Sequence, residues 1–371
     1  METSPKFTWK WMLSASGSFI SCFIFLLCLK HNNEAEHFRD LRHAMFNVAS
    51  SLENSFSNPA NFEISKPARK KSKNKCNIFE GRWVYESKGS PYYEAPQCPF
   101  LSEQVSCQKN GRPDFDYENW SWEAHDCVIP SFNGKDILKR FRGKRVIIVG
   151  DSLNRNQWES LACLLYSTIP PSRTHLDFSN GSYKVFKAKT MDLSSLHWQG
   201  VDIMVFNTGH WWVHHGKFKL KLESAFEVAM RTWANWIDQN VSLTKTTVFF
   251  RSISPAHKGQ NGCYNKTQPT TNTSHVTHFL KSLIEIVDRT LTKMRVPVRY
   301  LNIIKLSEHR IDAHPSVYAK KKGDNLVTGK LKPPECFSDC NHWYLPGLPD
   351  TWNRLLYTSL VLDKPTDSPS L

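Results

Sequence analysis

The sequence lacks several patterns that would place it in a common class of ligand-binding protein. It has no Gly-rich phosphate-binding loop, so nothing in it predicts a nucleotide-type site. Its cysteine spacings form no tight metal knuckle, which argues against bound zinc. No segment repeats along the chain, which excludes a solenoid or a propeller. We therefore expect no metal and no resident cofactor.

Acidic residues are fewer than basic ones: 34 Asp and Glu stand against 48 Lys and Arg, a formal charge of +14. This balance favours an anionic partner or surface. However, six of the basic residues lie in the ten residues Lys66 to Lys75, and no aromatic residues alternate with them. A nucleic-acid-binding face would interleave the two types, so we expect no nucleic-acid binding. The basic run is a solvated spacer or, alternatively, a contact for an acidic lipid or polymer surface.

Near the N-terminus, the apolar run Met12 to Leu29 is bounded by lysines and preceded by Trp9 and Trp11. Its eighteen residues would span about 27 Å as a helix, enough to cross a thin bilayer. A cleaved signal peptide is the alternative, but no small-residue cleavage site follows Leu29. The run therefore predicts an uncleaved signal anchor, with the larger part of the chain in the lumen of the secretory pathway.

Cysteines and glycosylation sequons independently favour that compartment. Eight cysteines lie beyond the apolar run, and an even number in an oxidising lumen predicts up to four disulfides, whereas free buried thiols would fit a cytosolic protein. These candidates are Cys76, Cys98, Cys107, Cys127, Cys163, Cys263, Cys336 and Cys340. Five sequons predict N-glycosylation, although sequons also arise by chance. They lie at Asn119, Asn180, Asn240, Asn265 and Asn272.

Changes in composition divide the chain into five parts. Residues 1–11 form a short cytoplasmic tail, 12–29 the membrane anchor, and 30–75 a flexible basic stem without sustained periodicity. Residues 76–143 form a Cys- and aromatic-rich cap, held by disulfides and by aromatic packing against a larger domain. Its aromatic side chains are interpreted as core residues, with stacking on sugar rings as the alternative. Residues 144–371 are expected to form the larger domain, which carries the candidate catalytic residues described below.

The catalytic part alternates strands and helices, which predicts an α/β fold with a mainly parallel sheet flanked by helices on both faces. The expected strands are Val146 to Val149, Val201 to Phe206, Thr246 to Phe250 and Val298 to Ile304. The expected helices are Leu153 to Tyr166, Leu220 to Ile237, His275 to Leu291 and Pro349 to Leu360. Active sites of such sheets lie at the carboxyl ends of the strands.

Ser152 lies at one such end, in the run Val146-Ile-Ile-Val-Gly-Asp-Ser-Leu-Asn-Arg-Asn-Gln157. A strand that breaks at Gly150 brings the serine hydroxyl to the first turn of a helix, whose N–H groups can stabilise negative charge. Gly-Asp-Ser is also a good turn and N-cap sequence, so alone it is weak evidence. Asn207 and Gly209 follow the next strand at the same edge.

A serine nucleophile needs a base, and His342 in Asp339-Cys-Asn-His-Trp343 is the informative candidate. An aspartate three residues ahead of a histidine can bond its Nδ1, which leaves Nε2 to face the serine. The alternatives are Asp339 as an N-cap and His342 as a hydrogen-bonded interface residue. Because Ser152 lies near the beginning of this domain and the pair lies near its end, just before the last helix, we interpret the three residues as a catalytic triad.

The chain resembles the plant trichome birefringence-like proteins, Golgi polysaccharide O-acetyltransferases with a GDSL/SGNH-esterase-like catalytic domain. The matching segments are CNIFEGRWV from Cys76, WSWEAHDC ending at Cys127, VGDSLNRNQWESL from Val149, NTGHWW from Asn207 and DCNHWYLPGLPDTWN from Asp339. The resemblance implies a single-pass type II Golgi membrane protein and supports the triad of Ser152, His342 and Asp339. It also makes Gly150, Asp151, Arg155, Asn207 and Gly209 candidates for the oxyanion hole or for substrate positioning.

The expected reaction follows from the resemblance: an acetyl donor of unknown identity acylates Ser152, and a cell-wall polysaccharide accepts the acetyl group, with xylan as the first candidate. Polysaccharide deacetylation, or a non-catalytic polysaccharide-binding role, are the alternatives. The family usually has a cysteine where this chain has Tyr344. We hypothesise that Cys336 replaces it as a disulfide partner that tethers the loop around Asp339.

Overall fold

The structure, a computed structural model, describes residues 76–86, 91–170, 198–210, 212, 219–258, 262–271, 278–319, 326–327, 330–331 and 337–362. The predicted anchor, the stem, Cys336 and the sequons Asn180 and Asn272 lie outside the described residues. Within those ranges, no helix is both long and apolar enough to span a bilayer. Among the sequons that are described, Asn240 and Asn265 are exposed.

Four parallel strands form the central sheet in the order in which they occur in the chain. They are β3 (Val146–Val149), β4 (Ile203–Phe206), β5 (Thr247–Arg251) and β6 (Val298–Leu301). This confirms the predicted parallel sheet, with strand ends shifted by at most three residues. The largest shift is at β6, because Ile304 already begins the short helix α8 (Ile304–Glu308).

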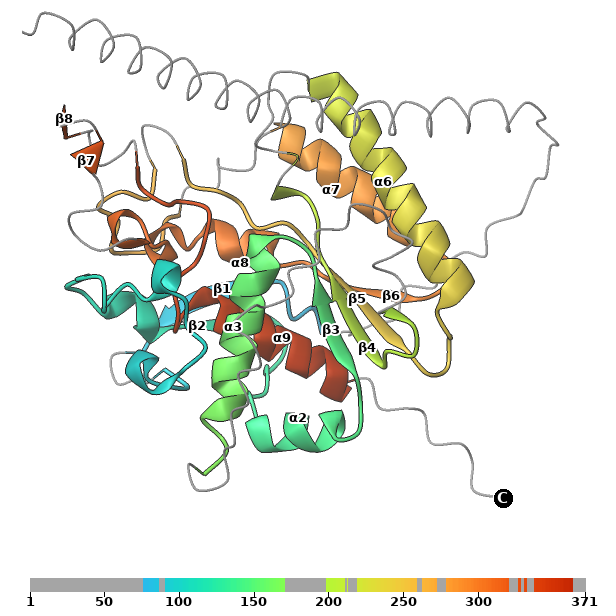
Figure 1. Cartoon of the computed structure of the whole chain (residues 1–371), viewed down its shortest axis with the longest axis horizontal. Coiled ribbons are helices and arrows are strands. Elements are labelled where there is room, and N and C mark those ends of the chain that lie inside the picture. The colour runs from blue at the N-terminus through green and yellow to red at the C-terminus, as the bar shows by residue number, and fades with distance from the viewer. Residues whose placement is uncertain are drawn as a thin grey trace, which may run out of the picture. The chain divides into compact units, whose positions relative to one another are not determined.

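Helices cover both faces of the sheet, as predicted (Figure 1). On one face, α6 (Lys219–Asn240) and α7 (His278–Leu291) pack with Phe206 and Phe250 of the strands. On the other face, α9 (Leu348–Leu362) packs Leu356 against Val205 and Phe249. The helix α3 (Ser152–Tyr166) packs against both α9 and α2 (Gly134–Phe141), and α2 was not expected from the sequence.

The N-terminal block, which is the predicted cap of residues 76–143, contains an antiparallel pair of strands, β1 (Gly81–Tyr85) and β2 (Trp120–Ala124). It also contains several short turns of helix. Its aromatic residues Tyr117 and Trp122 are buried in one core cluster with Trp343 and Trp352 of the C-terminal segment. The core interpretation is therefore confirmed for Tyr93, Tyr117 and Trp122, whereas Tyr85 and Tyr92 remain 43% and 42% exposed. The remaining elements are η1 (Ala95–Gln97), η2 (Glu103–Val105), η3 (Asp116–Asn119), η6 (Ile311–Ala313), η7 (Val317–Ala319), β7 (Leu326–Val327) and β8 (Lys330–Leu331).

Among the described residues, three disulfides link Cys76 to Cys127, Cys98 to Cys163 and Cys263 to Cys340. The expectation that Cys107 also forms a disulfide is wrong, because this thiol is free and buried in the same core cluster as Tyr344. Burial raises the pKa of Cys107, so the thiol is uncharged. The loop around Asp339 is tethered through Cys263, and the hypothesis about Cys336 stays a prediction.

Gly150 marks the tightest point between the sheet and α3. A Cβ at this position would lie 2.6 Å from Nδ2 of Asn154 and 2.6 Å from the backbone oxygen of Asn207. We expect Gly150→Ala to lower the free energy of unfolding by about 3 kcal/mol, because neither neighbour is free to move. Chemical denaturation measures this change.

Gly143→Ala is the matched control, since Gly143 has φ +70° but no atom within 4 Å of its Cβ position. The control should lose about 1 kcal/mol from backbone strain alone. Equal losses at the two glycines would contradict the steric account of Gly150.

Candidate active site

The turn between β3 and α3 presents Ser152 at the first position of the helix. Asp151 is the N-cap residue, and its carboxylate accepts a hydrogen bond of 3.0 Å from the N–H of Leu153. Asn154 donates its side-chain N–H back to the carbonyl of Val149 at 2.7 Å, which closes the turn against the strand. The structure thus confirms the strand-turn-helix predicted around the serine.

The structure brings His342 and Asp339 to Ser152, although 190 residues separate the histidine from the serine. Nε2 of His342 lies 2.7 Å from Oγ of Ser152, and its Nδ1 lies 2.8 Å from Oδ2 of Asp339. Oδ1 of Asp339 accepts the backbone N–H groups of Asn341 and His342, each at 3.1 Å. This arrangement can pass a proton from the serine hydroxyl to the imidazole.

Asp339 is ionised in this arrangement. Burial opposes its charge, but the hydrogen bonds and charge of His342, together with an N–H from Gln104, outweigh it and hold the pKa of Asp339 well below its ordinary value. The carboxylate can therefore orient the His342 ring and stabilise the imidazolium that forms during proton transfer.

Polar residues on α3 hold the helix to the segment that carries His342. Asn156 makes two hydrogen bonds to the backbone of Trp343: its Nδ2 donates to the carbonyl at 2.7 Å and its Oδ1 accepts the N–H at 2.8 Å. Further along, Gln157 donates to Asn353 of α9 at 3.2 Å. These hydrogen bonds fix how α3 meets the segment of His342, and they thereby set the distance between Ser152 and His342.

Arg251, at the end of β5, forms a hydrogen bond with Asn154 in the first turn of α3, next to Ser152. Its side chain is fully buried, donates to Asn154 and lies 4.7 Å from the ring of Trp352. Burial lowers its pKa to about 10, while the nearby Asp151 opposes the shift, so the guanidinium stays charged. Burial raises the pKa of Asp151, and Arg251 and the N–H groups of Leu153 and His210 counter this.

Two buried histidines lie behind His342. Nδ1 of His314 is 2.7 Å from the carbonyl oxygen of His342, and its Nε2 is 2.6 Å from Nδ1 of His257. The His314 ring also stacks on Trp343, with 3.9 Å between centroids. Burial, followed by the neighbouring His257, lowers the pKa of His314 well below its ordinary value.

The structure changes the expected roles of the positioning candidates. The Nδ2 group of Asn207 donates to the carbonyls of Arg251 and Ser252, at 3.0 and 3.2 Å, and thereby joins the ends of β4 and β5. Its role in an oxyanion hole or in substrate positioning stays a prediction. Arg155 donates to Gln104 at 2.8 Å and pairs with Glu159 at 3.5 Å.

The other three candidates are backbone positions or caps. Gly150 allows close packing, as described above, and Asp151 caps α3. Gly209 has φ +146°, and a Cβ there would approach Ile253 to 3.0 Å, so the loop after β4 needs glycine. The backbone N–H groups of Ser152 and Gly209 remain the candidates for an oxyanion hole.

Four residues of the site were missed from the sequence: Gln104, Asn156, Arg251 and His314. Asn156 lies two residues beyond Asn154 in a recognisable motif, but nothing local shows that its partner is Trp343, 187 residues away. Gln104 and Arg251 belong to segments with no catalytic pattern. His314 could be noted only as one of fifteen histidines.

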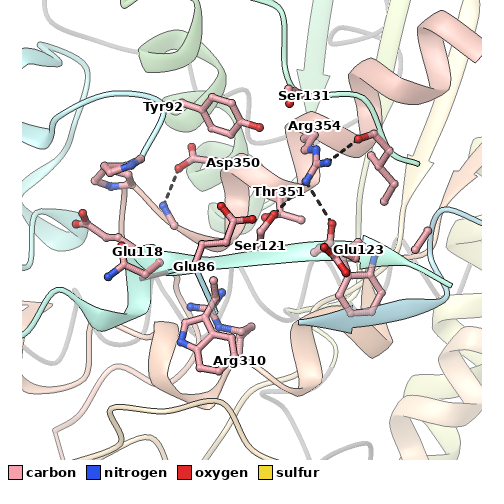
Figure 2. Close-up of a pocket in the computed structure, with 18 of the residues that line it drawn as sticks. Glu86, Tyr92, Glu118, Ser121, Glu123, Ser131, Arg310, Asp350, Thr351 and Arg354 are labelled. Carbon is pink, nitrogen blue, oxygen red and sulfur yellow. Dashed lines mark hydrogen bonds between the residues drawn. The ribbon is translucent and has the colours of Figure 1, made fainter. Parts of the chain in front are cut away.

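A cavity of about 670 Å³ lies beside β2, and Ser152, Asp339 and His342 are not among its lining residues (Figure 2). Asp350 and Arg354 of α9 line it, and Arg354 donates to the carbonyls of Ile129 and Pro130. Burial raises the pKa of Asp350 to about 7, opposed by hydrogen bonds from Ser160, Gly347 and Tyr93. Within the described ranges, no group of three or more His, Cys, Asp or Glu could hold a metal ion.

The lowered pKa of His314 predicts acid sensitivity. Below about pH 6.5 the unfolded chain binds a proton on this ring and the folded protein does not, so the free energy of unfolding falls as the pH drops. His314→Asn keeps a donor for the His342 carbonyl but removes the titration. We expect the variant to lose less stability on acidification, by up to about 1.4 kcal/mol per pH unit.

Chemical denaturation of both proteins between about pH 5 and pH 6.5 measures the two slopes. His125→Asn is the control, because this exposed ring makes no buried contact to lose, and it should keep the wild-type slope. Identical slopes for the wild type and His314→Asn would contradict the prediction.

Comparison with known proteins adds the family. The PC-Esterase family, described as a GDSL/SGNH-like acyl-esterase family found in Pmr5 and Cas1p, matches residues 129–196 and 178–359. The PMR5 N-terminal domain matches residues 74–128.

Three relatives illustrate the likeness. Protein trichome birefringence-like 6 of Arabidopsis thaliana is 37% identical over 345 residues, which cover 77% of this chain and 70% of that protein. Protein trichome birefringence-like 3 of the same plant is 36% identical, covering 77% and 79%. Probable xylan O-acetyltransferase 8 of Oryza sativa subsp. japonica is 36% identical, covering 77% and 78%. This chain belongs to the trichome birefringence-like family.

Proposed function

We propose that this protein transfers acetyl groups to a hydroxyl of a plant cell-wall polysaccharide, with Ser152 as nucleophile, His342 as base and Asp339 as its orienting carboxylate. The observation that carries the proposal is the chain of two contacts, 2.7 Å from Ser152 to His342 and 2.8 Å from His342 to Asp339. Two relatives are named xylan O-acetyltransferase 6 and probable xylan O-acetyltransferase 8, which supports acetyl transfer and makes xylan the first acceptor to test.

In the first half-reaction, Nε2 of His342 takes the proton of Ser152 Oγ as the oxygen attacks the carbonyl carbon of the acetyl donor. Negative charge develops on the carbonyl oxygen, next to the N-terminus of α3, where backbone N–H groups and the helix dipole stabilise it. The donor's leaving group then takes the proton from His342. An acetyl ester on Ser152 results.

In the second half-reaction, His342 takes the proton of a sugar hydroxyl, and that oxygen attacks the acetyl-serine carbonyl. The acetyl group moves to the sugar, and Ser152 recovers its proton from His342. Transfer requires that the sugar hydroxyl reaches this carbonyl before water does, which depends on how the site binds the polymer and excludes solvent.

We further propose that the protein is anchored in the Golgi membrane through residues 12–29, with the catalytic domain in the lumen. The apolar run between lysines supports the anchor. Three disulfides support an oxidising compartment. The exposed Asn240 and Asn265 are accessible to a lumenal glycosylation system.

Deacetylation is the second candidate function, because the same triad would release acetate if water were the acceptor. The matching family description names an acyl-esterase, which keeps this candidate in view. Incubating the purified protein with an acetyl donor plus xylan, and separately with acetylated xylan, distinguishes the two. A transferase consumes the donor and acetylates the polymer, whereas an esterase releases acetate from the acetylated polymer.

We expect Ser152→Ala to reduce acetyl transfer by about a thousandfold or more while the protein stays folded, because the nucleophilic oxygen is lost. Product NMR of the polymer, together with circular dichroism of the variant, measures both effects. Ser167→Ala is the matched control, since Ser167 is an exposed serine at the other end of the same helix. Undiminished transfer by Ser152→Ala would contradict a catalytic serine and favour a non-catalytic binding role.

A further inference from the structure

Gln104, in the N-terminal block, contacts the two segments that form the proposed active site, namely α3 and the loop that carries Asp339 and His342. Its Nε2 lies 2.9 Å from Oδ2 of Asp339 and 3.0 Å from Nδ1 of His342. Its Oε1 accepts a hydrogen bond of 2.8 Å from the guanidinium of Arg155 on α3. One half-buried amide therefore joins the helix that carries Ser152 to the loop that carries the other two residues.

The neighbours of the amide determine which way it points. A guanidinium offers only donors and a carboxylate offers only acceptors, so the carbonyl oxygen of Gln104 must face Arg155 and its NH₂ must face Asp339. The opposite orientation would place the NH₂ against the guanidinium and the oxygen against the carboxylate. Because Nδ1 of His342 also donates to Oδ2, the Gln104 N–H serves the carboxylate rather than the ring.

The residues on either side of Gln104 form hydrogen bonds with the same two segments, α3 and the loop of His342. Ser102 donates its N–H and its hydroxyl to the buried carboxylate of Glu159 on α3, at 3.3 and 3.0 Å. The carbonyl of Val105 accepts the N–H of Leu345 at 3.2 Å, just beyond His342. The amide is therefore held in place by its backbone as well as by its own hydrogen bonds.

We propose that Gln104 is a positioning residue for acetyl transfer: it holds the carboxylate of Asp339 against His342, and the N-terminal block thereby completes the active site. This role rests on the proposed function of Ser152. It extends that function from the catalytic domain to the block that precedes it in the chain.

The physical reason lies in the number of donors on Asp339. Two backbone N–H groups bond its Oδ1, and His342 and Gln104 bond its Oδ2, so the carboxylate is held at both oxygens. When His342 becomes an imidazolium, a carboxylate held in this way stays in place and does not take the proton. If Gln104 were removed, His342 would be the only one of these four donors that still bonds Oδ2 of Asp339.

The charged groups around the amide determine how the activity of a Gln104→Glu variant would change with pH. Asp339 and His342 face Nε2, and Arg155, which also pairs with Glu159, faces Oε1. A glutamate at position 104 could still accept from Arg155. It could donate to Asp339 only while protonated, and once ionised it would repel that carboxylate.

Two variants of the full-length chain test the proposal, with acetylation of xylan as the readout. Gln104→Leu removes both hydrogen bonds and should lower kcat about tenfold, with KM for the polymer unchanged. Gln104→Glu should lose activity relative to the wild type progressively as the pH rises from about 4 to about 8, because the carboxyl group gives up its proton within this range. A merely structural role would not produce this pH-dependent ratio.

Gln97→Leu is the control, because Gln97 is an exposed glutamine of the same block whose side chain donates to Glu94, and the variant should match the wild type. If Gln104→Leu fails to fold, Gln104→Glu carries the test through its pH dependence. A kcat of Gln104→Leu within about twofold of wild type, or a constant ratio for Gln104→Glu, would overturn the role of Gln104 while Ser152→Ala stays inactive. An active Ser152→Ala protein would overturn this role and the proposed function together.

Discussion

The two hydrogen bonds between Asn156 and the backbone of Trp343 are the contact on which the site depends. They join α3 to the loop of His342 and satisfy a buried amide on one side and a buried peptide group on the other. Leaving either group unsatisfied would cost about 1–3 kcal/mol, so the two segments are held in one register. Because Ser152 begins α3 and His342 precedes Trp343, the same register sets the distance between the Ser152 hydroxyl and the His342 ring.

This contact belongs to a larger polar face on α3. Asn154, Asn156, Gln157, Glu159 and Ser160 are all buried, so the helix is not apolar on the side that faces the protein. Their partners lie on β3, β5, α9, the His342 loop and the N-terminal block. A buried polar group needs a partner at a particular place, whereas an apolar one tolerates several packings. The polar face therefore specifies how the segments around Ser152 meet.

The sequence was sufficient for the sheet and for the triad geometry, because both leave local patterns: alternating strands and helices, a strand that breaks at Gly150, and an Asp three residues before His342. It was not sufficient for Gln104, whose partner Asp339 lies 235 residues away and follows no periodicity. The position of Asn207 at a strand end likewise does not show that its amide donates to the carbonyls of Arg251 and Ser252. Cys107 was expected to pair because an even count of cysteines predicts pairs, but its thiol is free and buried in the same core cluster as Tyr344.

In the proposed reaction, Ser152 carries the acetyl group between donor and polysaccharide. Peptide mass spectrometry after brief mixing with an acetyl donor, without an acceptor polymer, would detect this intermediate. We expect one acetyl group on the peptide that contains Ser152, lost when xylan is added and absent from the Ser152→Ala protein. Acetylation of xylan by a protein whose Ser152 never carries the acetyl group would contradict the proposed reaction.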